Sequence, residues 1–584
     1  MPVRRRWQLI WGEATALLDR SRRLHWIDLF LVAELAGLLF GIVALARQFT
    51  HEKPPVAEID LSPWALPLYT FYSLARGLIA YVFSLSFTLV YGYWAAKDRT
   101  AERVLVPVLD ILQSIPVLGF MPGLLLVFVW LFPGSNLGLE LAAIVAIFTG
   151  QAWNMTFSFY QSVRSVPESM QEAATVYRFG WWQRFKWVEV PYATMGLVLN
   201  SMMSMAGGWF FLMTIEGLEI GGEKYWSPGI GSYIKAATTG DRWDWGAIVA
   251  GVMAMTLMIV ALDQLLWRPV VAWAQKFRVE EGGAQEEATS WFLDLLRRSR
   301  LVPVARDWLS RFRRPAVPVE PAKPAALADP TRPLRAGSFL STAFLLLLGG
   351  GMIFGAVALF FLIRHLEFEQ WRELVERAFL TLGRVLVTLV LATAWALPAG
   401  LAIGLTPKLS RILQPVVQVF ASFPAPLLFP MAVYVLNRFG VSLDWGSILL
   451  LLLGTQWYIL FNVIAGALAI PADLKEAATS YRITGWQRFR ALYFPAVFPY
   501  LVTGWVTAAG GAWNASIVAE YIDFETPPLA ARGLGASIME ATGSGDNALL
   551  AASVVVMSVV VVTFNRTVWR HLYQLADRRF SVQR

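Results

Sequence analysis

Two stretches of this chain match one another and stand 304 residues apart. Residues 172–186 read Glu-Ala-Ala-Thr-Val-Tyr-Arg-Phe-Gly-Trp-Trp-Gln-Arg-Phe-Lys, and residues 476–490 read Glu-Ala-Ala-Thr-Ser-Tyr-Arg-Ile-Thr-Gly-Trp-Gln-Arg-Phe-Arg. A proline five residues before each Glu and the acid itself favour the start of a helix. The glycine that follows is typical of a helix end. Each stretch therefore predicts a short helix, a turn and a second short helix.

The chain around these stretches has the composition of an integral membrane protein. It has 584 residues, of which 57% are hydrophobic and 15% are charged, whereas soluble domains carry about 25% charge. The absence of Cys excludes disulfides and thiol nucleophiles, and the four His are scattered. We therefore predict no catalytic residues and no metal site.

About twelve apolar segments are long enough to cross a membrane, which takes about 20 residues each. They are residues 27–46, 68–95, 104–132, 139–162, 193–215 and 245–268, and then 339–363, 379–405, 412–436, 445–468, 497–519 and 547–568. The two matched stretches lie in long basic loops, and the N-terminal segment and C-terminal tail are also basic. The positive-inside rule therefore places both termini and both loops in the cytoplasm.

The segments divide into two blocks of six. We predict a first repeat over 1–276, a cytoplasmic linker over 277–338 and a second repeat over 339–584, with an amphipathic surface helix within 290–312. A shift of 308 residues aligns Arg76 with Arg384. An even number of spans in each half makes the repeats parallel, so they should pack about an axis along the membrane normal with a pathway between them.

The matched loops resemble the EAA loop of the permeases of binding-protein-dependent ABC importers, and the resemblance covers nearly all of both halves. The chain is most similar to the duplicated permeases of the nitrate/sulfonate/bicarbonate anion group. The resemblance implies an all-α type I ABC importer permease fold in the bacterial inner membrane. It also implies that the first short helix of each loop docks on an ATPase through Glu172, Ala173, Ala174, Gly180, Glu476, Ala477, Ala478 and Gly485.

The resemblance also implies partners. The sequence has no Gly-rich loop ending in Gly-Lys-Ser/Thr, so ATP and Mg would be used by two copies of a separate ATPase subunit. A periplasmic or surface binding protein would deliver a small anion, which alternating access would carry inward. We expect membrane lipid around the chain, no nucleic acid, and no cofactor bound by the chain itself.

One position departs from the family pattern. The family's glycine usually falls six residues after the Glu, where this chain has Arg178 and Arg482. We therefore expect the turn to be displaced toward Gly180 and Gly485.

Prolines at membrane depth indicate where a pathway could lie, because they free backbone groups that only protein or a water-filled cavity can satisfy. The pathway candidates beside these breaks are Gln113, Ser114, Pro116, Gln418, Ser422 and Pro424. The polar ones could instead serve hydrogen bonding between helices. Arg76 and Arg384 could attract an anion, or could extend to the interface.

Three other classes of protein compete with an importer. A gradient-driven secondary transporter with 6+6 parallel repeats has the same span count, but needs no dock for an ATPase. A membrane scaffold gains nothing from broken helices. An enzyme would need a convergent carboxylate pair or a His/Cys cluster, which the predicted spans lack.

Overall fold

The structure is a computed structural model, and it describes residues 37, 40–44, 46–48, 58–239, 243–277, 290–299, 335–525 and 527–580. The side chains of residues 114, 335–341, 415 and 577 are outside this description. The first predicted span, 27–46, lies mostly outside the described residues, as does most of the predicted linker.

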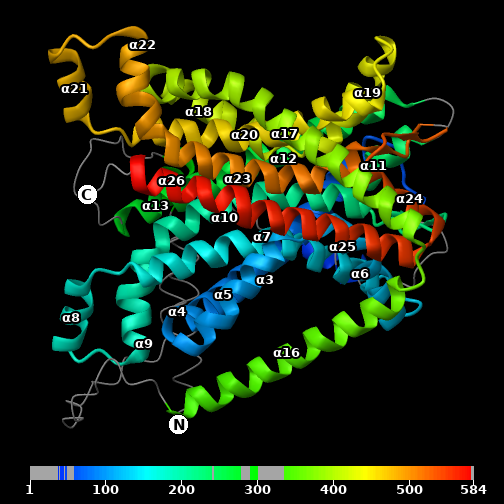
Figure 1. The fold of residues 1–584 in the computed structure, drawn as a ribbon, viewed down its shortest axis with the longest axis horizontal. Coiled ribbons are helices and arrows are strands. Elements are labelled where there is room, and N and C mark those ends of the chain that lie inside the picture. The colour runs from blue at the N-terminus through cyan, green and yellow to red at the C-terminus, as the bar shows by residue number, and fades with distance from the viewer. Residues whose placement is uncertain are drawn as a thin grey trace, which may run out of the picture.

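The described part of the chain is almost entirely helical, and the same order of elements occurs twice (Figure 1). The first half contains α3 (Leu66–Phe87), η1 (Thr88–Gly92), α4 (Tyr93–Lys97), α5 (Arg99–Ser114), α6 (Val117–Leu131), α7 (Leu137–Arg164), α8 (Glu168–Val176), α9 (Trp181–Arg184), η2 (Phe185–Glu189), α10 (Val190–Glu216), α11 (Ile230–Thr238), α12 (Trp245–Leu262), η3 (Asp263–Trp267), α13 (Arg268–Ala274) and η4 (Gln275–Phe277). The short α14 (Trp291–Arg298) lies within the predicted surface helix.

The second half contains α16 (Arg335–Ile363), α17 (Phe368–Leu405), α18 (Pro407–Ser422), η5 (Ala425–Leu428), α19 (Phe429–Arg438), α20 (Leu443–Leu468), α21 (Ala472–Ser480), α22 (Gly485–Arg488), η6 (Phe489–Tyr493), α23 (Phe494–Ala519), α24 (Leu534–Ser544), α25 (Asn547–Phe564), η7 (Asn565–Trp569) and α26 (Arg570–Phe580). Two small antiparallel ribbons occupy matching places after α10 and α23. They are β1 (Glu219–Ile220) with β2 (Glu223–Lys224), in which Glu219 pairs with Lys224, and β3 (Tyr521–Ile522) with β4 (Leu529–Ala530), in which Tyr521 pairs with Ala530.

Within the described residues, nine helices are long and apolar enough to cross a membrane, and two bent pairs raise the number to eleven. These eleven correspond to every predicted span except 27–46. The predicted all-helical membrane fold, with the same order of elements in two halves, is therefore confirmed.

The bent pairs are the third predicted span of each half. The angle between the two helices is 97° for α5 and α6, and 85° for the pair of α18 with the segment Ala425–Arg438. Each break falls on the residue before a proline, Ile115 or Phe423, whose backbone is extended. The ring of a following proline disfavours helical backbone at that residue, so Pro116 and Pro424 account for both breaks.

One of the hydrophobic clusters contains side chains from both halves. A single cluster of buried side chains combines Val117, Met121 and Leu125 of the first half with Ile459 and Val463 of the second. The helix α16 extends along the outside of the bundle and packs against α25 and also against α5 of the first half. The halves are therefore interleaved and do not form two separate bundles.

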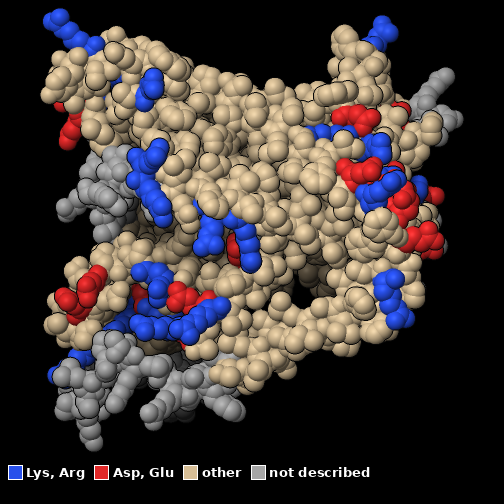
Figure 2. All heavy atoms as spheres, in the orientation of Figure 1, with Lys and Arg blue, Asp and Glu red and all other residues tan. Residues whose placement is uncertain are grey.

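Charged side chains gather mostly at the two ends of the long helices (Figure 2). The surface between the ends is largely uncharged, as expected for a band that faces lipid. One end carries α8 and α21, and the opposite end carries α11 and α24 (Figure 1).

Candidate functional site

The two matched loops both form a pair of short helices and project from the same end of the bundle. Figure 1 shows α8 with α9, and α21 with α22, standing out from that end. Both first helices begin directly after a proline, Pro167 or Pro471, whose backbone is extended. The predicted pair of short helices is therefore present in both loops.

The predicted docking residues divide into exposed and buried positions. The side chains of Glu172 and Glu476 are exposed, as are those of Ala173 and Ala477. The second alanine of each pair faces inward, since Ala174 and Ala478 are 3% and 6% exposed. Each helix thus presents its carboxylate and one small side chain outward, and is held by the other alanine.

The turn is not displaced, contrary to the prediction. Arg178 and Arg482 both have φ of +53°, the left-handed conformation that usually favours glycine. The Arg178 N–H donates to Thr175 O, and the Phe179 N–H donates to Ala174 O, both at 2.9 Å. Arg482 and Ile483 make the same two bonds, to Thr479 O and Ala478 O.

This is the Schellman arrangement, which satisfies the last carbonyls of the helix. The hydrogen bonds fix the turn six residues after each Glu, and the arginine adopts a conformation that costs roughly 1–2 kcal/mol for a residue with a Cβ. Gly180 lies beyond the turn in extended backbone, as the residue before α9. Gly485 has φ of +55° and opens α22.

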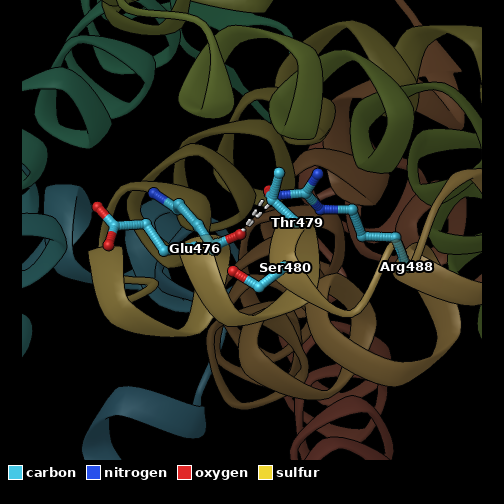
Figure 3. A pocket seen from close by; sticks show the side chains of 5 residues that line it. Glu476, Thr479, Ser480 and Arg488 are labelled. Carbon is cyan, nitrogen blue, oxygen red and sulfur yellow. Dashed lines mark hydrogen bonds between the residues drawn. The ribbon is translucent and has the colours of Figure 1, made fainter.

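A second arginine holds each loop together from inside. The Arg184 Nη2 donates to Thr175 Oγ1 at 3.0 Å, and the Arg488 Nη2 donates to Lys475 O at 3.1 Å. In Figure 3 the Arg488 side chain reaches from α22 across to α21, whereas Glu476 points away from it. An open hollow of about 380 Å³ lies here, lined by Lys475, Glu476, Thr479, Ser480 and Arg488.

The predicted pathway residues lie around the two helix breaks. Pro116 and Pro424 are buried, Gln418 and Ser422 are half-buried, and Gln113 is exposed. The side chain of Ser114 lies outside the described ones. A contact from a substrate is untested for all of them, so their role stays a prediction.

Asn514, which the sequence analysis did not single out, joins the two halves at the first break. Its Oδ1 accepts from the Val117 N–H at 2.7 Å, the first N–H of α6. At the matching place in the other half, Phe210 packs against the cluster that contains Ala425. The two breaks therefore have different chemistry, one polar and one apolar.

Arg76 lies in a closed cluster at the end of the bundle opposite the two loops. Its guanidinium is 0% exposed and makes two bonds of 2.6 Å to Glu140 and one of 2.7 Å to Glu216 Oε1. Ser73 Oγ also donates to Glu216 at 2.7 Å, and the Gly231 N–H donates to Glu216 Oε2 at 2.8 Å. The cluster ties α3, α7, α10 and the start of α11 together.

Arg384 lies in a matching cluster in the second half. Its Nη1 donates to Glu520 Oε1 at 2.8 Å, and its Nη2 donates to Asp444 Oδ1 at 2.7 Å. Thr381 Oγ1 donates to Glu520, and the Gly535 N–H donates to Glu520 Oε2 at 2.8 Å. Here the side chain of Asp444 is 52% exposed.

These contacts describe the surroundings of both arginines. Both side chains are buried, and each is paired with two carboxylates. Their described contacts join helices of the bundle, and a role in attracting an anion stays a prediction. Sequence reasoning missed Glu140, although an acid within an apolar span signals that a buried cation must lie near it.

Comparison with known proteins places these features in a family. The sequence model of the binding-protein-dependent transport system inner membrane component matches this chain twice, at residues 66–266 and 396–582. The two matches cover more than half of the chain and fall within the two predicted repeats.

Individual relatives match a shorter part of this chain than the family model does. The nitrate import permease protein of Leptolyngbya laminosa is 26% identical over 32% of this chain and 64% of its own length. The taurine transport system permease protein of Escherichia coli is 28% identical over 31% of this chain and 61% of its own. The bicarbonate transport system permease protein of Synechocystis is 31% identical over 24% of this chain and 49% of its own.

Proposed function

Because the chain belongs to the family of inner membrane components of binding-protein-dependent transport systems, we propose that it is the permease of an ATP-driven importer, with both coupling sites on one polypeptide. The observation that carries this is the pair of matching loops at one end of the bundle. A gradient-driven carrier has no need of them. ATP hydrolysis then belongs to two partner subunits, one on each loop.

Each loop is joined to the opposite end of the molecule by one continuous helix. The helical segment Trp181–Glu216 runs from the first loop to the Arg76 cluster, and Gly485–Ala519 runs from the second loop to Glu520. A helix of 36 residues is about 54 Å long. A displacement of α8 or α21 by an ATPase is therefore transmitted mechanically to the outer clusters.

Both helices contain a wider turn close to the loop, at η2 and η6. Such π-type turns are frequent at functional sites in helices. Each gives its helix a place to bend when the loops move together. In this mechanism the ATPase pair closes, the loops approach one another, and the pathway between the halves opens toward the outside.

The proposed cargo is a small oxygen-bearing anion. The three relatives above are named for nitrate, taurine and bicarbonate. A binding protein would deliver the anion at the end that carries α11 and α24. The loops, both termini and the linker would then face the cytoplasm of a bacterial cell, with the chain in the inner membrane.

Uptake into proteoliposomes tests this function. The chain is reconstituted with its cognate ATPase and binding protein, and labelled nitrate, bicarbonate and taurine are supplied in turn. We expect uptake of at least one of them only with ATP and the binding protein. Uptake driven by a proton or sodium gradient without ATP would establish the gradient-driven carrier instead.

A further inference from the structure

The turn of each loop presents an arginine whose position is unfavourable for its backbone. Arg178 and Arg482 occupy the left-handed conformation in both repeats. Glycine removes that strain, and asparagine reduces it. The same residue at the same strained position in both loops calls for a compensating use of its side chain.

Neither guanidinium is used to hold the loop together. Both side chains are exposed, and no described residue accepts a hydrogen bond from either of them. In contrast, Arg184 and Arg488 turn inward and bind α8 and α21. Each loop thus has one arginine that binds its first helix and, at the turn, another that faces away.

The neighbour of each outward arginine is an exposed aromatic side chain. Tyr177 is 74% exposed and Tyr481 is 81% exposed. Tyrosine and arginine are enriched among the residues that dominate the binding free energy of protein interfaces. A Tyr-Arg pair at the tip of both loops therefore has the composition of a docking anchor.

We infer that Tyr177-Arg178 and Tyr481-Arg482 insert into a socket on the partner ATPase that carries at least one carboxylate. This rests on the proposed function and specifies its partner surface. The carboxylate accepts from the planar guanidinium, and the tyrosine ring covers the socket from bulk water. The docking surface then includes the C-terminal tip of each short helix as well as its Glu-Ala-Ala face.

Binding of the purified ATPase to the full chain in nanodiscs tests this inference. Replacing both arginines by glycine relaxes the backbone, so the thermal midpoint of the chain should hold or rise. We nevertheless expect the Kd to increase by about tenfold or more, because each loop loses a charge-assisted contact. The double variant Arg178→Asn, Arg482→Asn should show a similar increase in Kd. This variant separates the effect of the lost charge from that of the backbone flexibility that glycine adds.

Two further measurements control for general electrostatics. Lys186→Ala with Arg490→Ala removes the same two positive charges from exposed positions of the same loops, and should change the Kd by less than about twofold. Arg178→Lys with Arg482→Lys keeps the charge but loses the planar fork, so its Kd should fall between those of the wild type and the Asn variant.

The possible results are distinct. If the Gly and Asn variants bind the ATPase as the wild type does, the arginines are not anchors and this inference is wrong, while the proposed function stands. If the control weakens binding as much as they do, only general charge is involved and the socket is also ruled out. If the wild-type chain itself binds no ATPase, the proposed function fails.

Discussion

The Arg76 and Arg384 clusters share a frame and differ in one carboxylate. In both, a buried glutamate accepts from the arginine, from a hydroxyl and from a glycine N–H. The second carboxylate that binds the arginine is Glu140 in the first half and Asp444 in the second. Glu140 is 1% exposed and binds through both oxygens, whereas Asp444 is 52% exposed and binds through one.

The two carboxylate side chains differ by one methylene group. Both carboxylate oxygens of the longer Glu140 side chain accept from the Arg76 guanidinium and form a bidentate pair. The shorter Asp444 offers Oδ1 to Arg384 and to the Arg532 N–H, and its own backbone carbonyl accepts from Arg384 Nε at 3.0 Å. The first repeat thus holds the start of α11 with a closed cluster, and the second repeat holds the start of α24 with a partly hydrated cluster.

Removing the two arginines should have the largest effect. Arg76→Met leaves Glu140 and Glu216 buried without their cation, and breaking a buried pair costs about 3–5 kcal/mol. Arg384→Met leaves only Glu520 buried, because water reaches Asp444. We expect a larger drop in the thermal midpoint for Arg76→Met in detergent. Equal drops would show that the exposure of Asp444 does not matter.

The glycines of the shared frame should be equally sensitive to substitution in both halves. A Cβ at Gly231 would lie 2.6 Å from Met213 O, and one at Gly535 would lie 2.3 Å from Ser516 O. Both contacts are with backbone, so each Gly→Ala change should destabilise the chain by about 1–3 kcal/mol. Thermal unfolding of the two variants measures this, and a neutral result for either would contradict the close packing at that glycine.

Exchanging the carboxylate that differs between the clusters tests the role of its length. Glu140→Asp should cost about 1–2 kcal/mol, because the bidentate pair is lost inside a buried cluster. Asp444→Glu should change stability by less than about 0.5 kcal/mol, since the added methylene extends into water. Denaturation midpoints of the two variants provide the comparison. A larger loss for Asp444→Glu would reverse our account.

The exposed edge of the Arg384 cluster should contribute least to the stability of the chain. Arg532 and Glu376 form a bond of 3.2 Å, with side chains 64% and 50% exposed. Glu376→Ala should therefore change stability by less than about 0.5 kcal/mol. A shift of several degrees in the thermal midpoint would show that this pair stabilises the cluster and would contradict the prediction.

The sequence predicted local and periodic features well. Apolar length located the eleven spans that the structure describes, and Pro116 and Pro424 marked the breaks because a proline acts on its own neighbour. The role of Arg76 could not be predicted, since its partners come from α7 and α10, 64 and 140 residues further along the chain. The position of the turn was also missed. Backbone hydrogen bonds at the helix end outweighed the preference of glycine for left-handed backbone.

The ATPase activity of the reconstituted complex tests the central claim most directly. The wild-type chain is compared with the double variant Glu172→Lys, Glu476→Lys, which reverses the charge on both exposed docking faces. We expect the variant to fold with an unchanged thermal midpoint, because both side chains are exposed, and to lose assembly or coupled ATPase activity. A variant that assembles and hydrolyses ATP like the wild type would contradict the assignment of these loops as the ATPase dock.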